Sequence, residues 1–128
     1  MERVTGIGGV FFRSARPDAL RLWYAEHLGL ELASLLDAQE SIPWFIEFVF
    51  AVHGRVRPFN KWLEWELERH PLPVDVVRLE RLERIARTGD LGEQQAQFRD
   101  AERLAREHGL GHVIDGWEPD LALLRGDP

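Results

Sequence analysis

Cysteine is absent from this 128-residue sequence, which excludes disulfide bonds, thiolate-ligated metal sites and a cysteine nucleophile. No apolar run reaches the length of about 18 residues that a membrane-spanning helix needs. Residues 1–3 do not begin the basic and then apolar pattern of a secretory signal peptide. From these absences we expect a cytoplasmic protein.

Positive charge is also scarce. The chain has 16 Lys and Arg residues against 22 Asp and Glu residues, and its formal net charge is −6. A negative chain repels the phosphates of nucleic acids and the headgroups of anionic membranes. We therefore expect neither nucleic acid nor a membrane as the main partner.

Apolar and aromatic residues are plentiful. Hydrophobic residues make up 45% of the chain and include five Trp and seven Phe. This supply is enough for one packed core, so residues 1–128 are expected to form a single domain.

The first 32 residues are expected to form a strand, a helix and a second strand. Residues 4–13 combine β-branched and aromatic residues with glycines, which favours a strand. Residues 18–28 carry apolar side chains at helical spacing and are followed by Gly29, a suitable helix end. A lone strand leaves its backbone groups unpaired, so we expect it to pair with residues 30–32 or with a second copy. The latter predicts a homodimer.

From residue 42 onward the pattern is helical. Ser41 and Pro43 are a suitable cap and first turn for a central helix over residues 44–52, which Gly54 would end. Further helices are expected over residues 58–69, 75–89, 90–109 and 117–124. Gly89 and Gly109 are expected to end the second and third of these, and Asp90 has the spacing of a capping box with Glu93. The predicted fold class is mainly α: a bundle of four to six helices with a short N-terminal β-strand element.

The N-terminal residues resemble the start of a glyoxalase-like module of the vicinal oxygen chelate superfamily. The resemblance rests on GIGGVFFR at residues 6–13, PDAL at 17–20 and WYAEHLGL at 23–30. It covers residues 4–32 and implies a βαβββ module. Family members commonly place a metal-binding His or Gln on the first strand, where this chain has Gly9.

Residues 42–124 resemble the C-terminal helical region of bacterial nucleotidyltransferase-domain proteins. The matching segments are PWFIEFVF at residues 43–50, RPFNKWLEWEL at 57–67, IARTGD at 85–90 and IDGWEPDL at 114–121. The resemblance implies an accessory bundle that shapes the acceptor side of the site and mediates association. The family's catalytic Gly-Ser turn and paired Asp residues are not found in this sequence. Two resemblances that meet near residues 33–41 indicate a composite chain, whether by natural fusion, frameshift or engineering.

These observations predict a non-catalytic helical module, either an interaction or assembly unit with a protein partner or a small-molecule-binding remnant. One alternative is the acceptor-binding partner subunit of a nucleotidyltransferase. Another is a glyoxalase-like metal-dependent enzyme completed by dimerisation. We expect no catalytic residue, metal site or cofactor in the chain by itself.

The best candidate ligand contacts are Asn60, Lys61 and Trp62, because this segment combines the chain's only lysine with aromatic residues. The alternative is a core-packing helix from which the lysine side chain extends to solvent.

Glu47 is a further candidate, because it is the only charge within residues 44–52. Aromatic surroundings would raise the pKa of its carboxyl and suit it to acid or base chemistry. The alternative is that Glu47 faces solvent or pairs with an arginine.

Two charge patterns have simpler explanations. His108 and His112 have the spacing of a metal-binding pair, but Gly109 and Gly111 are expected to break the helix that such a pair requires. Arginines recur at every third position from residue 78 to residue 87, which fits either a grip on a phosphate or an acidic partner, or the charged outer face of a helix.

Overall fold

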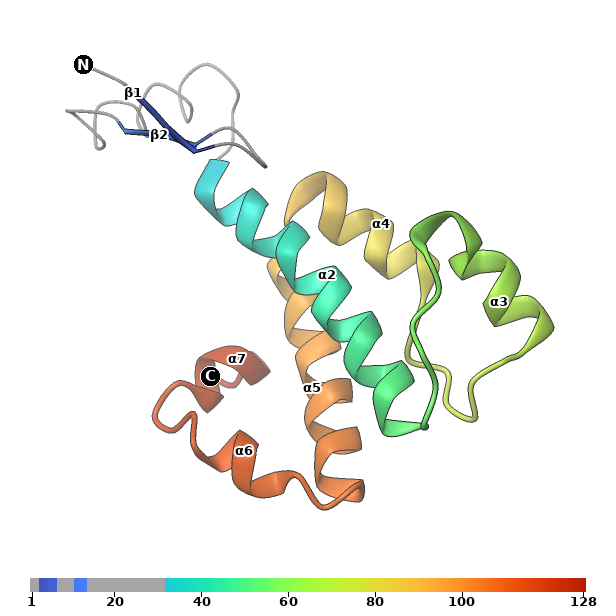
Figure 1. Cartoon of the computed structure of the whole chain (residues 1–128). Helices are drawn as coiled ribbons and strands as arrows, with labels where there is room; N and C mark the ends of the chain where they lie inside the picture. Colours follow the sequence, from blue (N-terminus) through green and yellow to red (C-terminus); the bar gives the residue numbers. More distant parts are fainter. Residues whose placement is uncertain (1–2, 7–10, 14–31) are drawn as a thin grey trace. The chain divides into compact units, whose positions relative to one another are not determined.

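The computed structural model describes residues 3–6, 11–13 and 32–128 (Figure 1). The chain divides into two compact units, Met1–Leu36 and Asp37–Pro128, which are described separately below. The helix predicted over residues 18–28 lies outside the described residues. The prediction of one domain over the whole chain stays a prediction.

The N-terminal unit contains two short antiparallel strands, β1 (Arg3–Gly6) and β2 (Phe11–Arg13). The paired positions are Arg3 with Arg13, Val4 with Phe12 and Gly6 with Phe11, with a register irregularity between Val4 and Gly6. The sequence predicted one strand over residues 4–13, and this is wrong, because the two halves of that segment pair with each other. Backbone groups that needed a partner therefore find it within the segment, and a homodimer through this strand stays a prediction.

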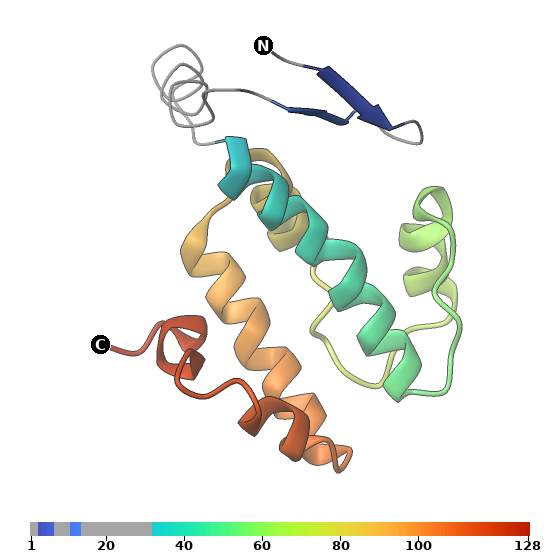
Figure 2. The ribbon, with the colours of Figure 1, turned by 60° about the vertical axis from the view of Figure 1, so that its left-hand side comes forward.

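The remaining described residues form helices. Their bounds are α2 (Leu32–Val52), the 3₁₀ helix η1 (Asn60–Trp62), α3 (Leu63–Arg69), α4 (Leu79–Thr88), α5 (Leu91–Glu107), α6 (Gly111–Asp115) and α7 (Leu121–Arg125). In two views the long helices α2 and α5 run side by side, with α3 on one side of them and α6 and α7 on the other (Figures 1 and 2). Within residues 32–128 there is no strand. None of the described helices is long and apolar enough to cross a membrane.

The fold class predicted from the sequence therefore needs correction. Most described residues are helical, but the predicted bundle with a single strand element is wrong: the strand segment is a hairpin, and Leu32 begins a helix instead of belonging to a second strand. Residues 32–40 are mostly strong helix formers, so the helix extends well ahead of the predicted start.

Helix α2 shows why its start was misplaced. Pro43 lies inside the helix instead of in its first turn. Ser41 does not cap the helix, because its hydroxyl donates a hydrogen bond of 2.6 Å to the carbonyl of Ala38 one turn earlier. A serine followed closely by a proline is typical of a helix start, but here both are accommodated in the interior of a helix that packing stabilises.

Several predicted helix ends are confirmed. Gly54, Gly89 and Gly109 all have positive φ angles, which a residue without a Cβ adopts at little cost. The Asp90 carboxylate accepts a hydrogen bond of 2.9 Å from the backbone N–H of Glu93, as expected of an N-cap.

Other predicted boundaries were wrong. Helix α4 begins at Leu79 and not at Asp75. Residues 75–78 precede the helix, and their two valines, Val76 and Val77, are buried in the core. The segment after α5 forms the short helix α6, which was not predicted from the sequence. The predicted break between His108 and His112 is confirmed, because α5 ends at Glu107 and α6 begins at Gly111. The predicted terminal helix is shortened to α7.

Two hydrophobic clusters hold residues 37–128 together. The larger cluster joins α2 to α4, α5 and the segment before α4, and its buried members are Phe45, Ile46, Val49, Phe50, Val76, Val77, Leu82 and Leu104. The smaller cluster joins α5 to α6 and α7 through Ala105, Ile114 and Leu121. Leu104 and Ala105 are neighbours in α5 but belong to different clusters. Helix α5 therefore packs in both clusters and is the central helix of this unit.

Candidate functional site

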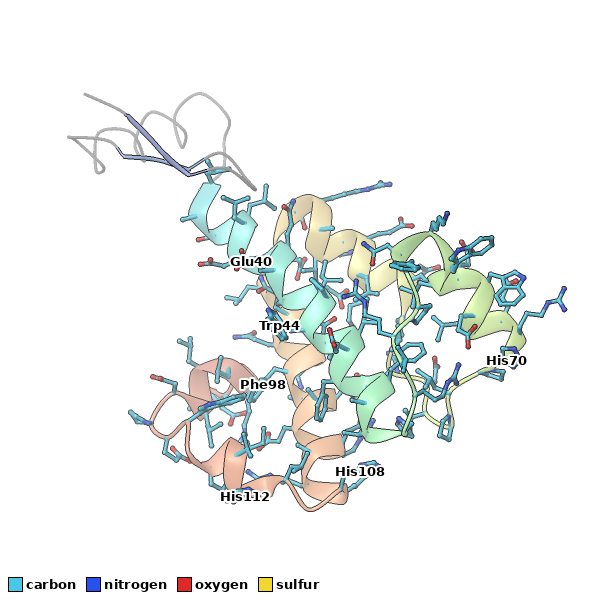
Figure 3. The ribbon with its side chains drawn as sticks, in the orientation of Figure 1. Glu40, Trp44, His70, Phe98, His108 and His112 are labelled. Atoms are coloured by element: carbon cyan, nitrogen blue, oxygen red, sulfur yellow. The ribbon has the colours of Figure 1, made fainter. Side chains whose placement is uncertain are left out.

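An apolar groove lies between α2, α5 and the C-terminal segment that contains α6 and α7. Its volume is about 710 Å³. The apolar residues that line it are Trp44, Phe45, Phe48, Leu91, Phe98, Ala101, Ala105, Leu110, Val113, Ile114, Trp117, Leu123 and Leu124. Figure 3 labels Trp44 and Phe98, which line the groove from α2 and α5. Trp44 is 74% exposed, so the groove opens to solvent.

The polar side chains that line the groove are Ser41, Gln94, Gln95 and Gln97, and none of the described lining residues is charged. Ser41 donates to a carbonyl of its own helix. The side-chain amide of Gln94 donates a hydrogen bond to the carbonyl of Gly89. The side-chain amide of Gln95 donates one to the carbonyl of Leu123, and both bonds measure 3.0 Å. All three side chains therefore have a hydrogen-bond acceptor, and the bond from Gln95 also joins α5 to α7.

Gln97 differs from the other polar lining residues. Its side chain is 4% exposed, and its Oε1 atom has no hydrogen-bond partner among the described residues. Leaving a buried acceptor without a partner costs about 1–3 kcal/mol, so such groups are rare in native structures. The sequence analysis missed Gln97. A signal was present, because Gln97 precedes Ala101 and Leu104 at helical spacing and therefore lies on the inner stripe of its helix.

The wall formed by α6 and α7 is attached to α5 by ion pairs. Glu102 of α5 accepts two hydrogen bonds from Arg125 of α7, at 2.8 and 2.6 Å, and two from Arg106, at 3.2 and 2.9 Å. Arg106 also donates to Asp115 at the end of α6, at 2.8 Å. The hydrogen bonds from Arg125 are the main reason why the pKa of the Glu102 carboxyl is lowered from 4.5 to about 2.

A second ion-pair cluster joins α4 to α5. Arg81 is only 9% exposed; its Nη1 donates to Asp100 at 2.8 Å, and its Nε lies 3.5 Å from a carboxylate oxygen of Glu93. The exposed side chain of Arg84 forms an ion pair with Glu93 of α5. The exposed side chain of Arg87 forms one with Glu83, one turn earlier in α4. The alternative of a charged outer face therefore holds for these two arginines but is wrong for Arg81, which points into the helix interface.

The predicted ligand contacts Asn60, Lys61 and Trp62 lie together in η1. The Lys61 ammonium is 5.4 Å from the centre of the Trp62 ring, and Asn60 accepts a hydrogen bond from Arg57. The ring of Trp62 meets that of Trp65 edge-on, with centroids 6.1 Å apart. Asn60, Lys61 and Trp62 are all exposed, so this segment forms an aromatic surface and not the core-packing face of the alternative.

Glu47, the fourth predicted contact, lies on α2 with an exposed side chain. The solvent-facing alternative therefore describes its position. Neither Glu47 nor the three residues of η1 belong to the lining of the apolar groove. The ligand contacts predicted from the sequence therefore lie on a different surface from the apolar groove.

His53 and His108 lie at the ends of helices α2 and α5. Nδ1 of His53 lies 2.7 Å from the Val49 carbonyl, and Nδ1 of His108 lies 2.8 Å from the Leu104 carbonyl, in each case one turn earlier in the chain. Figure 3 labels His108 near the end of α5 and His112 on α6. In the part of the chain that the structure describes, no group of three or more His, Cys, Asp or Glu side chains is placed to hold a metal ion.

The groove offers an uncharged apolar surface, several aromatic rings and a buried acceptor without a partner among the described residues. This combination suits non-covalent binding of an apolar molecule. Comparisons with family models, curated protein sequences and solved structures found no match to this chain.

Proposed function

We propose that residues 37–128 form a non-catalytic binding module that takes up an apolar ligand in the groove between α2, α5, α6 and α7. The observation that carries this proposal is the groove itself, with a volume of about 710 Å³ and a lining without charged residues. Ligand sites in proteins have comparable volumes and are lined mainly by hydrophobic and aromatic side chains.

The exposed apolar side chains around the groove support the same role. Trp44, Trp117 and Leu123 line the groove and remain exposed. Removing apolar surface from water contributes about 25 cal/mol per Å². An occupant that covers these side chains therefore gains binding free energy that the unoccupied protein leaves unused, and contiguous apolar surface of this kind marks binding sites.

The resemblance of residues 42–124 to an accessory helical region also supports a role in binding rather than catalysis. If the chain is instead the acceptor-binding partner of a nucleotidyltransferase, the groove is still the surface that best accommodates an apolar occupant. A glyoxalase-like role would depend on N-terminal residues, most of which lie outside the described part of the chain.

The neutral dye Nile red, which fluoresces strongly in apolar sites, tests the proposal. The variants are Val113→Asp and its control Val56→Asp. Val113 lines the groove and is 47% exposed, whereas Val56 is 92% exposed and does not line it. Both substitutions place the same charge on the surface, but only the first places it in the groove, where an apolar ligand would have to desolvate it.

We expect saturable binding of about one dye per folded chain, weakened about tenfold or more by Val113→Asp and unchanged by Val56→Asp, since tenfold corresponds to only about 1.4 kcal/mol. Near-ultraviolet circular dichroism checks that each variant is folded. Absence of saturable binding to the folded protein, or equal effects of the two substitutions, would show that the groove is not the binding site.

A further inference from the structure

We infer that the occupant of the groove is an uncharged, aromatic small molecule with one hydrogen-bond donor, which Gln97 recognises. This inference rests on the proposed function and specifies the chemistry of its ligand. Three features of the groove lead to it: a lining without charged residues, the aromatic side chains and the buried Gln97 acceptor that has no partner among the described residues.

The uncharged lining of the groove favours an uncharged ligand. The chain is rich in ionisable residues, yet none of those in the described part of the chain lines the groove. A charged ligand would lose its hydration there without gaining an ion pair, which is strongly unfavourable. An uncharged ligand avoids this cost.

The aromatic lining favours a flat ring system. Aromatic side chains line the groove from three parts of the chain: α2, α5 and the segment after α6. Phe98 and Trp117 face each other with ring centroids 6.1 Å apart and planes tilted by 39°. Rings prefer offset or edge-to-face neighbours, so an aromatic ligand finds suitable partners on more than one wall.

Gln97 supplies the polar contact. The other polar lining side chains each donate a hydrogen bond to a backbone carbonyl, whereas Oε1 of Gln97 is buried and has no partner among the described residues. This oxygen is shielded from solvent in the empty groove. The terminal torsion of a glutamine is broad, so a rotation of the amide can turn the oxygen toward a ligand donor. The donor would then remove the cost of an unsatisfied acceptor.

An extended peptide fits these features less well. Each of its residues brings a backbone donor and acceptor that must be paired when buried, and only four polar side chains of the described residues line the groove. A helix from a partner protein or from a second copy pairs its own backbone groups and is the main competing occupant, which the experiment separates.

The experiment compares two probes of nearly the same shape, 2-naphthol and 2-methoxynaphthalene, by isothermal titration calorimetry. Only the naphthol carries a donor. The test variant is Gln97→Met, which keeps a long side chain but removes the acceptor. The control is Gln94→Met, at a lining glutamine whose amide already donates to a backbone carbonyl.

With the unmodified protein we expect naphthol to bind about three- to tenfold more tightly than the ether, the range of one net hydrogen bond. Gln97→Met should bring the two affinities together, whereas Gln94→Met should preserve the difference. Thermal unfolding of both variants establishes that they fold.

Equal affinities in the unmodified protein, a preference that survives Gln97→Met, or no binding of either probe would overturn the inference. If Nile red still binds the groove in those cases, the proposed function stands and only the ligand chemistry is wrong. If sedimentation shows a dimer that Val113→Asp dissociates, a second copy occupies the groove and the inference is also overturned.

Discussion

Arg81 is the buried cation between α4 and α5, and replacing it should reduce stability far more than replacing an exposed arginine of the same helix. The proposed substitution is Arg81→Met, with Arg87→Met as its control. Both remove a guanidinium and keep an apolar stem. Arg81 is 9% exposed and donates to Asp100 at 2.8 Å, whereas Arg87 is 77% exposed and lies 3.7 Å from its partner glutamate.

The expected magnitude follows from these environments. A hydrogen bond to a charged group contributes about 1.5–3 kcal/mol, and Arg81 also approaches Glu93. In the Arg81→Met variant, Glu93 still pairs with Arg84 and Asp100 with Arg103, and the methionine retains part of the packing. The loss of stability is therefore smaller than for a buried carboxylate left without any partner. We therefore expect Arg81→Met to lower the free energy of unfolding by about 2–3 kcal/mol. Arg87→Met should change it by at most about 0.5 kcal/mol.

Urea denaturation followed by far-ultraviolet circular dichroism measures both values, because the midpoint shifts with stability at constant slope. A double-mutant cycle of Arg81→Met with Asp100→Asn should give a coupling free energy of about 1 kcal/mol or more. Equal losses for the two arginine substitutions, or a coupling close to zero, would refute the view that the buried ion pair joins these helices.

Three further predictions concern the core, the groove and the effect of pH. Phe50→Ala removes a fully buried ring from the larger cluster and should cost about 3–5 kcal/mol in urea denaturation, unlike the same change at the exposed Phe59. Gln97→Met should raise the free energy of unfolding by about 1 kcal/mol, because it removes a buried acceptor without a partner; a loss of that size would show that the amide is satisfied. The pKa of Glu102 is lowered to about 2, chiefly by hydrogen bonds from Arg125, so its charge stabilises the fold above its ordinary pKa of 4.5 and this contribution is lost as the pH falls from there toward 2. The stability difference between the unmodified protein and Glu102→Gln should therefore be complete at pH 7 and shrink toward pH 2, and a difference that does not change with pH would contradict this assignment.

The helix ends show how far local sequence signals reach. Gly54, Gly89 and Gly109 were predicted as stops and have positive φ angles, and Asp90 was predicted as a cap and accepts the expected hydrogen bond. Each of these features depends on residues within about one helical turn, so the sequence contains all the information needed.

Helix α2 and the N-terminal hairpin show where local signals mislead. Pro43 indicated a helix start, yet it lies inside α2, because the buried face of that helix stabilises it against the loss of one backbone hydrogen bond. The strand residues were expected to pair over a long distance or with another copy, whereas β1 pairs with the neighbouring β2. Propensity indicates that a segment is extended, but not which partner it chooses.

The candidate site was the least predictable feature. Asn60, Lys61 and Trp62 stood out by composition, and they lie on an exposed surface that does not line the groove. The groove is assembled from side chains between residues 41 and 124, on four helices and the segments that join them, and no spacing in the sequence relates these side chains. Only the position of Gln97 on an apolar stripe indicated that one polar group would be buried.

By itself, the sequence determined the absence of cysteine chemistry, the helical character from residue 42 onward, the glycine stops and the Asp90 cap. The tertiary structure decided that Arg81 is buried, that Glu102 holds α7 against α5, and that α2, α5, α6 and α7 enclose an apolar groove. The physical reason is range: capping and propensity act between neighbours in the chain, whereas burial and ion pairing depend on which distant segments meet.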